Sequence, residues 1–225
     1  MIPAVGPRLI LIDGLPGSGK TTLALALGEK IPNAKVLLEN RGENPLHAVP
    51  AEEDVAEFGA IYDFSVEQFA ELSLQAWRRF VESANLRTYI AESYPFQSGV
   101  RLLLQMDADR SLIWNYFAAI EEIVTPLDPL LIFLRLRDPG DDLRTVSELR
   151  GAEWHAAVRS FVGRTTWARN RLLTGDEAIW QFVSAYAALV DELLADSAIP
   201  RLELEGGAKF GPSTIQSALA RHGPI

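Results

Sequence analysis

The chain of 225 residues contains no cysteine. This absence excludes disulfides, thiolate nucleophiles and zinc sites built on cysteine. Its three histidines lie far apart, at positions 47, 155 and 222, so a histidine-based metal site is not expected. Basic residues are also few: the chain has 21 lysines and arginines against 30 aspartates and glutamates, a net charge of −9. This balance argues against a nucleic-acid partner.

Long apolar runs are scarce as well. No continuous run approaches the roughly 20 residues that cross a bilayer, and residues 1–7 are too short and too interrupted by proline and glycine for a signal peptide. We therefore expect a cytoplasmic protein without a membrane partner. No repeat or linker is evident, which predicts one domain over residues 1–225. A homodimer is possible.

Short strand-like runs alternate with helical patterns along the whole chain. The expected strands cover residues 8–13, 35–38, 88–91, 130–134 and 201–204. Helices are expected at 22–30, at 65–84, around 113–124 and around 179–193. Strands that alternate with helices predict an α/β fold, with a parallel sheet covered by helices on both faces.

One further helix is expected to run through residues 154–172. Its buried stripe would consist of Trp154, Val158, Phe161, Thr165, Ala168 and Leu172. Residues 174–177, Thr-Gly-Asp-Glu, have the spacing of a capping box at the start of the last helix.

Residues 14–21, Gly-Leu-Pro-Gly-Ser-Gly-Lys-Thr, match the phosphate-loop pattern G-x-x-x-x-G-K-[ST]. They follow the first expected strand and open the first helix, where backbone N–H groups and the helix N-terminus attract phosphate. Lys20 would reach the β- and γ-phosphates, and the Thr21 hydroxyl would ligate Mg²⁺. The motif predicts ATP and Mg²⁺ as cofactors, bound by Gly14, Pro16, Gly17, Ser18, Gly19, Lys20, Thr21 and Thr22.

This loop, an acid after the third strand and an arginine-rich segment after the fourth resemble the P-loop kinases of the nucleoside and nucleotide kinase group. Thymidylate kinase is a well-known member, and small bacterial kinase-like proteins of unassigned substrate carry a similar loop. The resemblance implies a three-layer P-loop NTPase fold with sheet order 2-3-1-4-5. It also implies an acceptor-side helical insertion at about 43–87 and an arginine-bearing lid at about 140–175. The implied activity is transfer of the ATP γ-phosphoryl group to a small-molecule acceptor.

Glu92 is the acid that ends the third strand. Ligands of open α/β sheets bind at the carboxyl ends of the strands. In the resembling kinases, the acid at this place orients Mg²⁺-bound water or accepts the proton of the acceptor hydroxyl; the alternative is an ordinary solvated glutamate. Ser93 departs from the group, which has an acceptor-binding arginine there. A monophosphate acceptor is therefore in doubt, with Arg101 as a candidate replacement.

Other candidate residues follow the second, fourth and fifth strands. Glu39, Asn40 and Arg41 lie where the group binds its acceptor. Residues 135–171 contain eight arginines, no lysine and five acids, a net charge of +3. Phosphoryl transfer needs cationic donors on the γ-phosphate oxygens, and the resembling kinases supply them from the lid. The candidates are Arg164 and Arg169, then Arg150, with a solvated helix as the alternative. Residues 206–209, Gly-Gly-Ala-Lys, resemble the loop that edges the adenine ring in these kinases, which implies that Lys209 lies beside the ring.

Three other functions stay open. A switch-type NTPase would hydrolyse ATP or GTP, but the sequence has neither an Asn-Lys-x-Asp guanine-reading motif nor an apolar strand ending in Asp-Glu. A non-catalytic ATP-binding protein would act through partners. An enzyme is distinguished from it by a Glu92 carboxylate within reach of the γ-phosphate and Mg²⁺. A kinase of antibiotics or other metabolites is the third, since Ser93 replaces the arginine of the group.

Overall fold

The computed structural model describes residues 6–39, 44–48, 64–136, 144, 147–148 and 150–206. Its sheet has five parallel strands in the order β2-β3-β1-β4-β5, which confirms the expected topology. The strands are β1 (Leu9–Gly14), β2 (Lys35–Leu37), β3 (Tyr89–Glu92), β4 (Pro129–Arg135) and β5 (Arg201–Glu205).

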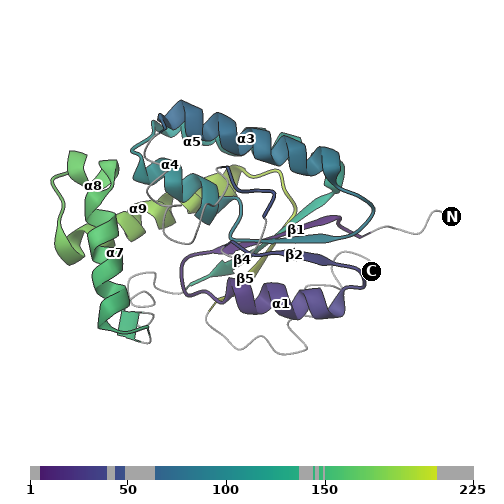
Figure 1. Cartoon of the computed structure of the whole chain (residues 1–225), viewed down its shortest axis with the longest axis horizontal. Coiled ribbons are helices and arrows are strands. Elements are labelled where there is room, and N and C mark those ends of the chain that lie inside the picture. Colours follow the sequence, from purple (N-terminus) through teal and green to yellow (C-terminus); the bar gives the residue numbers. More distant parts are fainter. Residues whose placement is uncertain are drawn as a thin grey trace.

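Helices cover both faces of this sheet (Figure 1). The described residues form the helices α1 (Lys20–Lys30), α3 (Val66–Ser83), α4 (Arg101–Gln105), α5 (Arg110–Val124), α7 (Ala152–Arg164), α8 (Thr166–Asn170) and α9 (Gly175–Asp196), of which α7 and α8 lie beyond the edge of the sheet. The short turns η2 (Phe96–Val100) and η3 (Thr125–Leu127) precede α4 and β4. Figure 1 shows α1 on one side of the sheet and α3 and α5 on the other.

Alternation along the central strand creates these two layers. Leu9 and Leu11 join the large core cluster that includes side chains of α3, α5 and α9. Ile10 and Ile12 face the other way and pack with Leu23 and other side chains of α1. Successive side chains of a strand point to opposite faces, so a continuously apolar strand suits a sheet buried on both sides.

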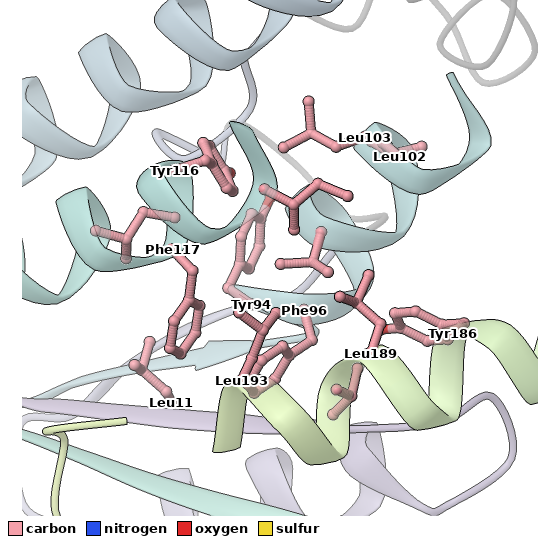
Figure 2. Packing of buried hydrophobic residues seen from close by; sticks show 14 of the residues in the cluster. Leu11, Tyr94, Phe96, Leu102, Leu103, Tyr116, Phe117, Tyr186, Leu189 and Leu193 are labelled. Carbon is pink, nitrogen blue, oxygen red and sulfur yellow. The ribbon is translucent and has the colours of Figure 1, made fainter. Parts of the chain in front are cut away.

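An aromatic cluster fixes the segment that follows β3. The Phe96 ring stacks on Phe117 with centroids 5.1 Å apart and meets Phe133 edge-on at 5.9 Å. Tyr94 packs edge-on against Trp77 at 6.0 Å. Figure 2 shows Tyr94 and Phe96 enclosed among side chains of α4, α5 and α9. The polar residues that follow Phe96 therefore start from a well-packed position.

The single helix expected through residues 154–172 is wrong, because the chain breaks into α7 and α8. Thr165 adopts extended backbone with φ −64° and ψ 150°, and its hydroxyl accepts a hydrogen bond from the Ala168 N–H. A threonine that caps a new helix competes with continuation of the old one. Thr165 and Ala168 of the expected stripe are still buried, but Leu172 is 90% exposed with φ 54°.

The capping box expected at the start of α9 is also wrong. Thr174 is the N-cap, but its side chain makes no capping hydrogen bond. The Asp176 carboxylate lies 3.0 Å from His155 Nε2 and accepts a hydrogen bond when that nitrogen carries the proton. By length and composition, with a mean hydropathy of 1.3, α9 would suffice to cross a membrane. Here its residues Ile179, Phe182 and Leu193 are buried in the core of the fold.

Candidate functional site

The phosphate loop connects β1 to α1 at the carboxyl edge of the sheet. A Cβ on Gly14 would lie 2.5 Å from the Leu134 carbonyl oxygen, so only glycine fits beside β4. The Ser18 hydroxyl is 0% exposed and has no hydrogen-bond partner among the described residues. Buried polar groups normally have partners, so this orphaned hydroxyl fits a loop that receives a phosphate oxygen.

Lys20 is enclosed within this loop and only 6% exposed. Its ammonium donates to the Gly14 carbonyl at 2.9 Å, the Leu15 carbonyl at 3.2 Å and Gln97 Oε1 at 2.7 Å. Burial lowers the pKa of Lys20, and the nearby carboxylates of Asp13, Glu39 and Glu92 act in the opposite direction. A cation held this way suits contact with an anion that enters the loop.

The structure brings Thr21 and Glu92 together. The Thr21 hydroxyl donates to Glu92 Oε1 at 3.1 Å, and the Ser93 hydroxyl donates to the same oxygen at 2.9 Å. The Glu39 N–H donates to Glu92 Oε2 at 3.1 Å. The Glu92 carboxylate, 5% exposed, thus faces the phosphate loop. Mg²⁺ prefers oxygen ligands and keeps several waters, so a threonine hydroxyl beside a carboxylate fits this ion.

Four residues beyond the loop form a second polar group, here called the Glu39 cluster: Glu39, Gln97, Ser98 and Arg101. Gln97 Nε2 donates to Glu39 Oε2 at 2.6 Å, and the Ser98 hydroxyl donates to Oε1 at 2.8 Å. The Arg101 guanidinium lies 3.7 Å from the same Oε1. Arg101, the candidate replacement for the arginine missing at position 93, therefore sits beside Glu39. Asn40 and Arg41 lie outside the described residues.

Asp13, at the end of β1, was missed by the sequence analysis. One carboxylate oxygen accepts from the Gly14 N–H at 2.7 Å, and the other accepts from Phe96 N–H at 2.7 Å and Gln97 N–H at 3.3 Å. Asp13 thereby ties the phosphate loop to the segment after β3. Burial raises its pKa to about 7, against the opposing effects of Lys20 and the three N–H donors. The signal that pointed to Glu92, an acid ending a buried strand, could have identified Asp13.

Stability should respond to the titration of Asp13. The pKa of Asp13 is about 7 in the folded state against an ordinary value of 3.8, so the folded state binds this proton more tightly than the unfolded state does. The free energy of unfolding should therefore fall as pH rises through this window, by at most about 1.4 kcal/mol per pH unit. The Asp13→Asn variant lacks this titrating group. Denaturant titrations from about pH 5 to pH 8 should therefore show its free energy of unfolding rising relative to that of the wild type. A constant difference between the two proteins contradicts the raised pKa.

The candidate lid residues Arg164 and Arg169 lie on α7 and α8, beyond the edge of the sheet at which α1 begins (Figure 1). Arg164 Nε donates to the Ser160 carbonyl at 3.2 Å, and Arg169 Nη2 donates to Thr166 Oγ1 at 3.3 Å. These contacts stay within α7 and α8, and both side chains are exposed. A hollow of about 640 Å³ between α7 and α9 is lined instead by Arg144, Arg159, His155 and Trp180, among others. Neither Arg144 nor Arg159 was selected from the sequence.

A lid arginine that stabilises the transferring phosphoryl group should affect rate more than binding. Arg164→Ala or Arg169→Ala should then lower turnover by about tenfold or more, with little change in ATP affinity. The corresponding lysine variants should recover only part of the loss, because lysine lacks the planar fork of arginine. Arg78→Ala on α3, an exposed arginine paired with Glu71, is the matched control. Equal small losses in turnover and affinity would favour a solvated helix.

The end of β5 lies against the phosphate loop. The Gly206 N–H donates to the Arg135 carbonyl at 2.8 Å. A Cβ at Gly206 would come within 3.0 Å of Ser18 Cβ and 3.2 Å of the Ser18 carbonyl, so a larger residue would crowd the loop. Lys209, expected beside the adenine ring, lies outside the described residues.

No protein-family model and no curated protein sequence matches the chain. The structure is similar to that of the YorR protein from Bacillus subtilis in complex with phosphorylated GDP, with a TM-score of 0.53 and 10% identity over 95% of this chain and 94% of that chain. It is also similar to thymidylate kinase from Candida albicans, with a TM-score of 0.50 and 18% identity over 96% and 90% of the two chains. Together with the strand order, these similarities show that the chain has the fold of the thymidylate kinase-like P-loop proteins.

Proposed function

We propose that the chain is an ATP- and Mg²⁺-dependent kinase that transfers the γ-phosphoryl group to a hydroxyl or phosphate oxygen of a small molecule. The observation that carries this proposal is the 3.1 Å hydrogen bond from Thr21 to Glu92 at the mouth of the phosphate loop. It joins a residue of the nucleotide-binding motif to a buried carboxylate from the neighbouring strand. Such a carboxylate can act on the metal-bound water or on the attacking group.

Each residue of the site has a chemical task in this proposal. Backbone N–H groups of the loop and Lys20 bind the β- and γ-phosphates, and the Thr21 hydroxyl holds Mg²⁺, which would neutralise charge on the phosphate oxygens. The acceptor oxygen forms a bond to the γ-phosphorus while the bond to the β–γ bridging oxygen breaks and ADP leaves. Glu92 receives the acceptor proton or orients the metal-bound water. The catalysis comes mainly from positioning and electrostatics.

The Glu39 cluster supports an acceptor site next to the phosphates. Its carboxylate, carboxamide, hydroxyl and guanidinium groups can each hydrogen-bond a polar small molecule. Lys20 connects this cluster to the phosphate loop through its 2.7 Å hydrogen bond to Gln97. Nucleosides, nucleotides and other hydroxyl-bearing metabolites are all compatible with such groups. The thymidylate kinase fold agrees with this proposal.

Two alternatives differ from the proposal in what happens to ATP. A switch-type NTPase would pass the γ-phosphoryl group to water, and a non-catalytic protein would retain ATP unchanged. The position of the Glu92 carboxylate beside Thr21 favours catalysis over simple binding. The Glu39 cluster beside the loop favours an organic acceptor over water.

The proposed function is tested by measuring ADP release with and without acceptors. The panel would contain nucleosides, nucleoside monophosphates and hydroxyl-bearing metabolites, and mass spectrometry would identify any phosphorylated product. We expect almost no ADP release without an acceptor and a large increase with one acceptor class. ADP release that is equally fast with and without every acceptor would identify a hydrolase. Binding without any ADP release would identify a non-catalytic protein.

A further inference from the structure

One side chain joins the phosphate loop to the Glu39 cluster. Gln97 Oε1 accepts a hydrogen bond from the Lys20 ammonium at 2.7 Å, while Gln97 Nε2 donates to Glu39 Oε2 at 2.6 Å. The two ends of one carboxamide thus hold a cation and an anion from different parts of the site. Neither the resemblance nor the motifs of the sequence assigned a role to Gln97.

The backbone of Gln97 is anchored, so movement at this position falls to the side chain. Its N–H donates to Asp13 Oδ2 at 3.3 Å, and its carbonyl accepts from Arg101 Nε at 3.0 Å. The preceding residue, Phe96, is fully buried in the aromatic cluster. The Gln97 side chain is only half-buried and can rotate without disturbing that packing.

The ammonium of Lys20 has three donors, and all three are used in the structure. Two bind carbonyl groups of the phosphate loop itself, and the third binds Gln97. A phosphate that enters the loop must take at least one of these donors. Gln97 lies outside the loop and belongs to the Glu39 cluster, so its bond to Lys20 is the one that a phosphate can replace without breaking a contact within the loop.

We propose that Gln97 is a positioning residue that holds the Lys20 ammonium at the Glu39 cluster until the phosphates of a nucleotide take the ammonium from it. Through its second hydrogen bond, Gln97 links this release of Lys20 to the position of Glu39. The proposal rests on the nucleotide-binding function proposed above. When phosphate takes Lys20, the carboxamide loses one of its two anchors and Glu39 becomes freer to meet an acceptor. By linkage, an acceptor that engages Glu39 also loosens the hold on Lys20, so each ligand favours the other.

The sign of an affinity change tests this role. Gln97→Leu keeps a similar volume but removes both hydrogen bonds, and Gln97→Ala removes the side chain beyond Cβ. Both should bind the β,γ-imido analogue of ATP with Mg²⁺ about two- to tenfold more tightly than the wild type, because one retaining hydrogen bond is lost. Isothermal titration calorimetry measures this. A merely structural role predicts weaker binding. Gln75→Leu, at an exposed position on α3, should leave affinity unchanged.

The link to Glu39 is tested by a double-mutant cycle. Glu39→Ala removes a charge near Lys20 in both backgrounds. In the wild-type background it also frees the Gln97 carboxamide, an effect that the Gln97→Leu background cannot show. The factor by which Glu39→Ala changes analogue affinity should therefore differ by about twofold or more between the wild-type and Gln97→Leu backgrounds. Equal factors would overturn the link.

The outcomes separate the role of Gln97 from the proposed function. Unchanged or weaker analogue binding by both Gln97 variants, with circular dichroism and melting temperature like those of the wild type, would overturn the retention of Lys20. Failure of the wild type to bind the analogue would overturn the nucleotide-binding claim on which the retention depends. Tighter binding by both variants supports the inference, because loss of a structural contact would not improve the site.

Discussion

Lys20→Ala is expected to abolish detectable turnover and to weaken ATP binding strongly, while the fold is retained. The ammonium supplies a charge-assisted contact to phosphate worth roughly 1.5–3 kcal/mol, which corresponds to about ten- to a hundredfold in affinity. Its effect on turnover should be larger, because charge on the γ-phosphoryl group changes most in the transition state. Calorimetry with the Mg²⁺ complex of the analogue and an ADP-release assay measure the two quantities.

Lys30→Ala is the matched control for this prediction. Lys30 is exposed in the last turn of α1, the helix that begins at Lys20, so the same substitution is made at its far end. It should change neither affinity nor turnover. A well-folded Lys20→Ala protein with unchanged affinity and turnover would overturn the assignment of residues 14–21 as a phosphate loop.

Glu92→Gln is expected to reduce phosphoryl transfer by about 10²–10⁴, the range for loss of a general base. The glutamine keeps one oxygen that can accept from the hydroxyls of Thr21 and Ser93, whereas its NH₂ group replaces the oxygen that accepts from the Glu39 N–H. It loses the charge and basicity that would act on the acceptor proton or the metal-bound water. ATP affinity should therefore stay within a few-fold of the wild-type value, and single-turnover kinetics separate transfer from binding.

The control here is Glu29→Gln, an exposed glutamate near the end of α1. This variant should match the wild type in both affinity and rate. A Glu92→Gln protein that transfers phosphoryl groups at the wild-type rate would exclude Glu92 from the reacting centre. Parallel losses in affinity and rate would instead indicate that Glu92 serves nucleotide binding alone.

The phosphate loop and the strands were predictable because their signals are local. The spacing of residues 14–21 is contiguous, and β1 and β4 are short apolar runs that need no tertiary context. The sheet order came from the resemblance instead, and the structure confirms it. Gln97 had no local signal, since its position between Lys20 and Glu39 depends on strands that lie far apart in sequence.

The errors in the lid region have a different origin. Helical spacing of apolar residues extends across Thr165, but the threonine hydroxyl caps a new helix and turns the chain there. The apolar spacing therefore continues past Thr165, although helix α7 ends before it. At Thr174 the spacing of a capping box was present, yet no capping hydrogen bond forms. Local patterns identify which residues can cap, whereas the packing of neighbouring elements decides which of them do.

A structure with Mg²⁺ and the β,γ-imido analogue of ATP tests the central claim most directly. The account predicts the phosphates in the loop of residues 14–21, Lys20 released from Gln97 to the phosphate oxygens, and Mg²⁺ against the Thr21 hydroxyl. The Glu92 carboxylate, now 3.1 Å from that hydroxyl, should reach the metal through a water molecule or face the γ-phosphate. A bound analogue with Glu92 directed away from both the metal and the γ-phosphate would contradict the account.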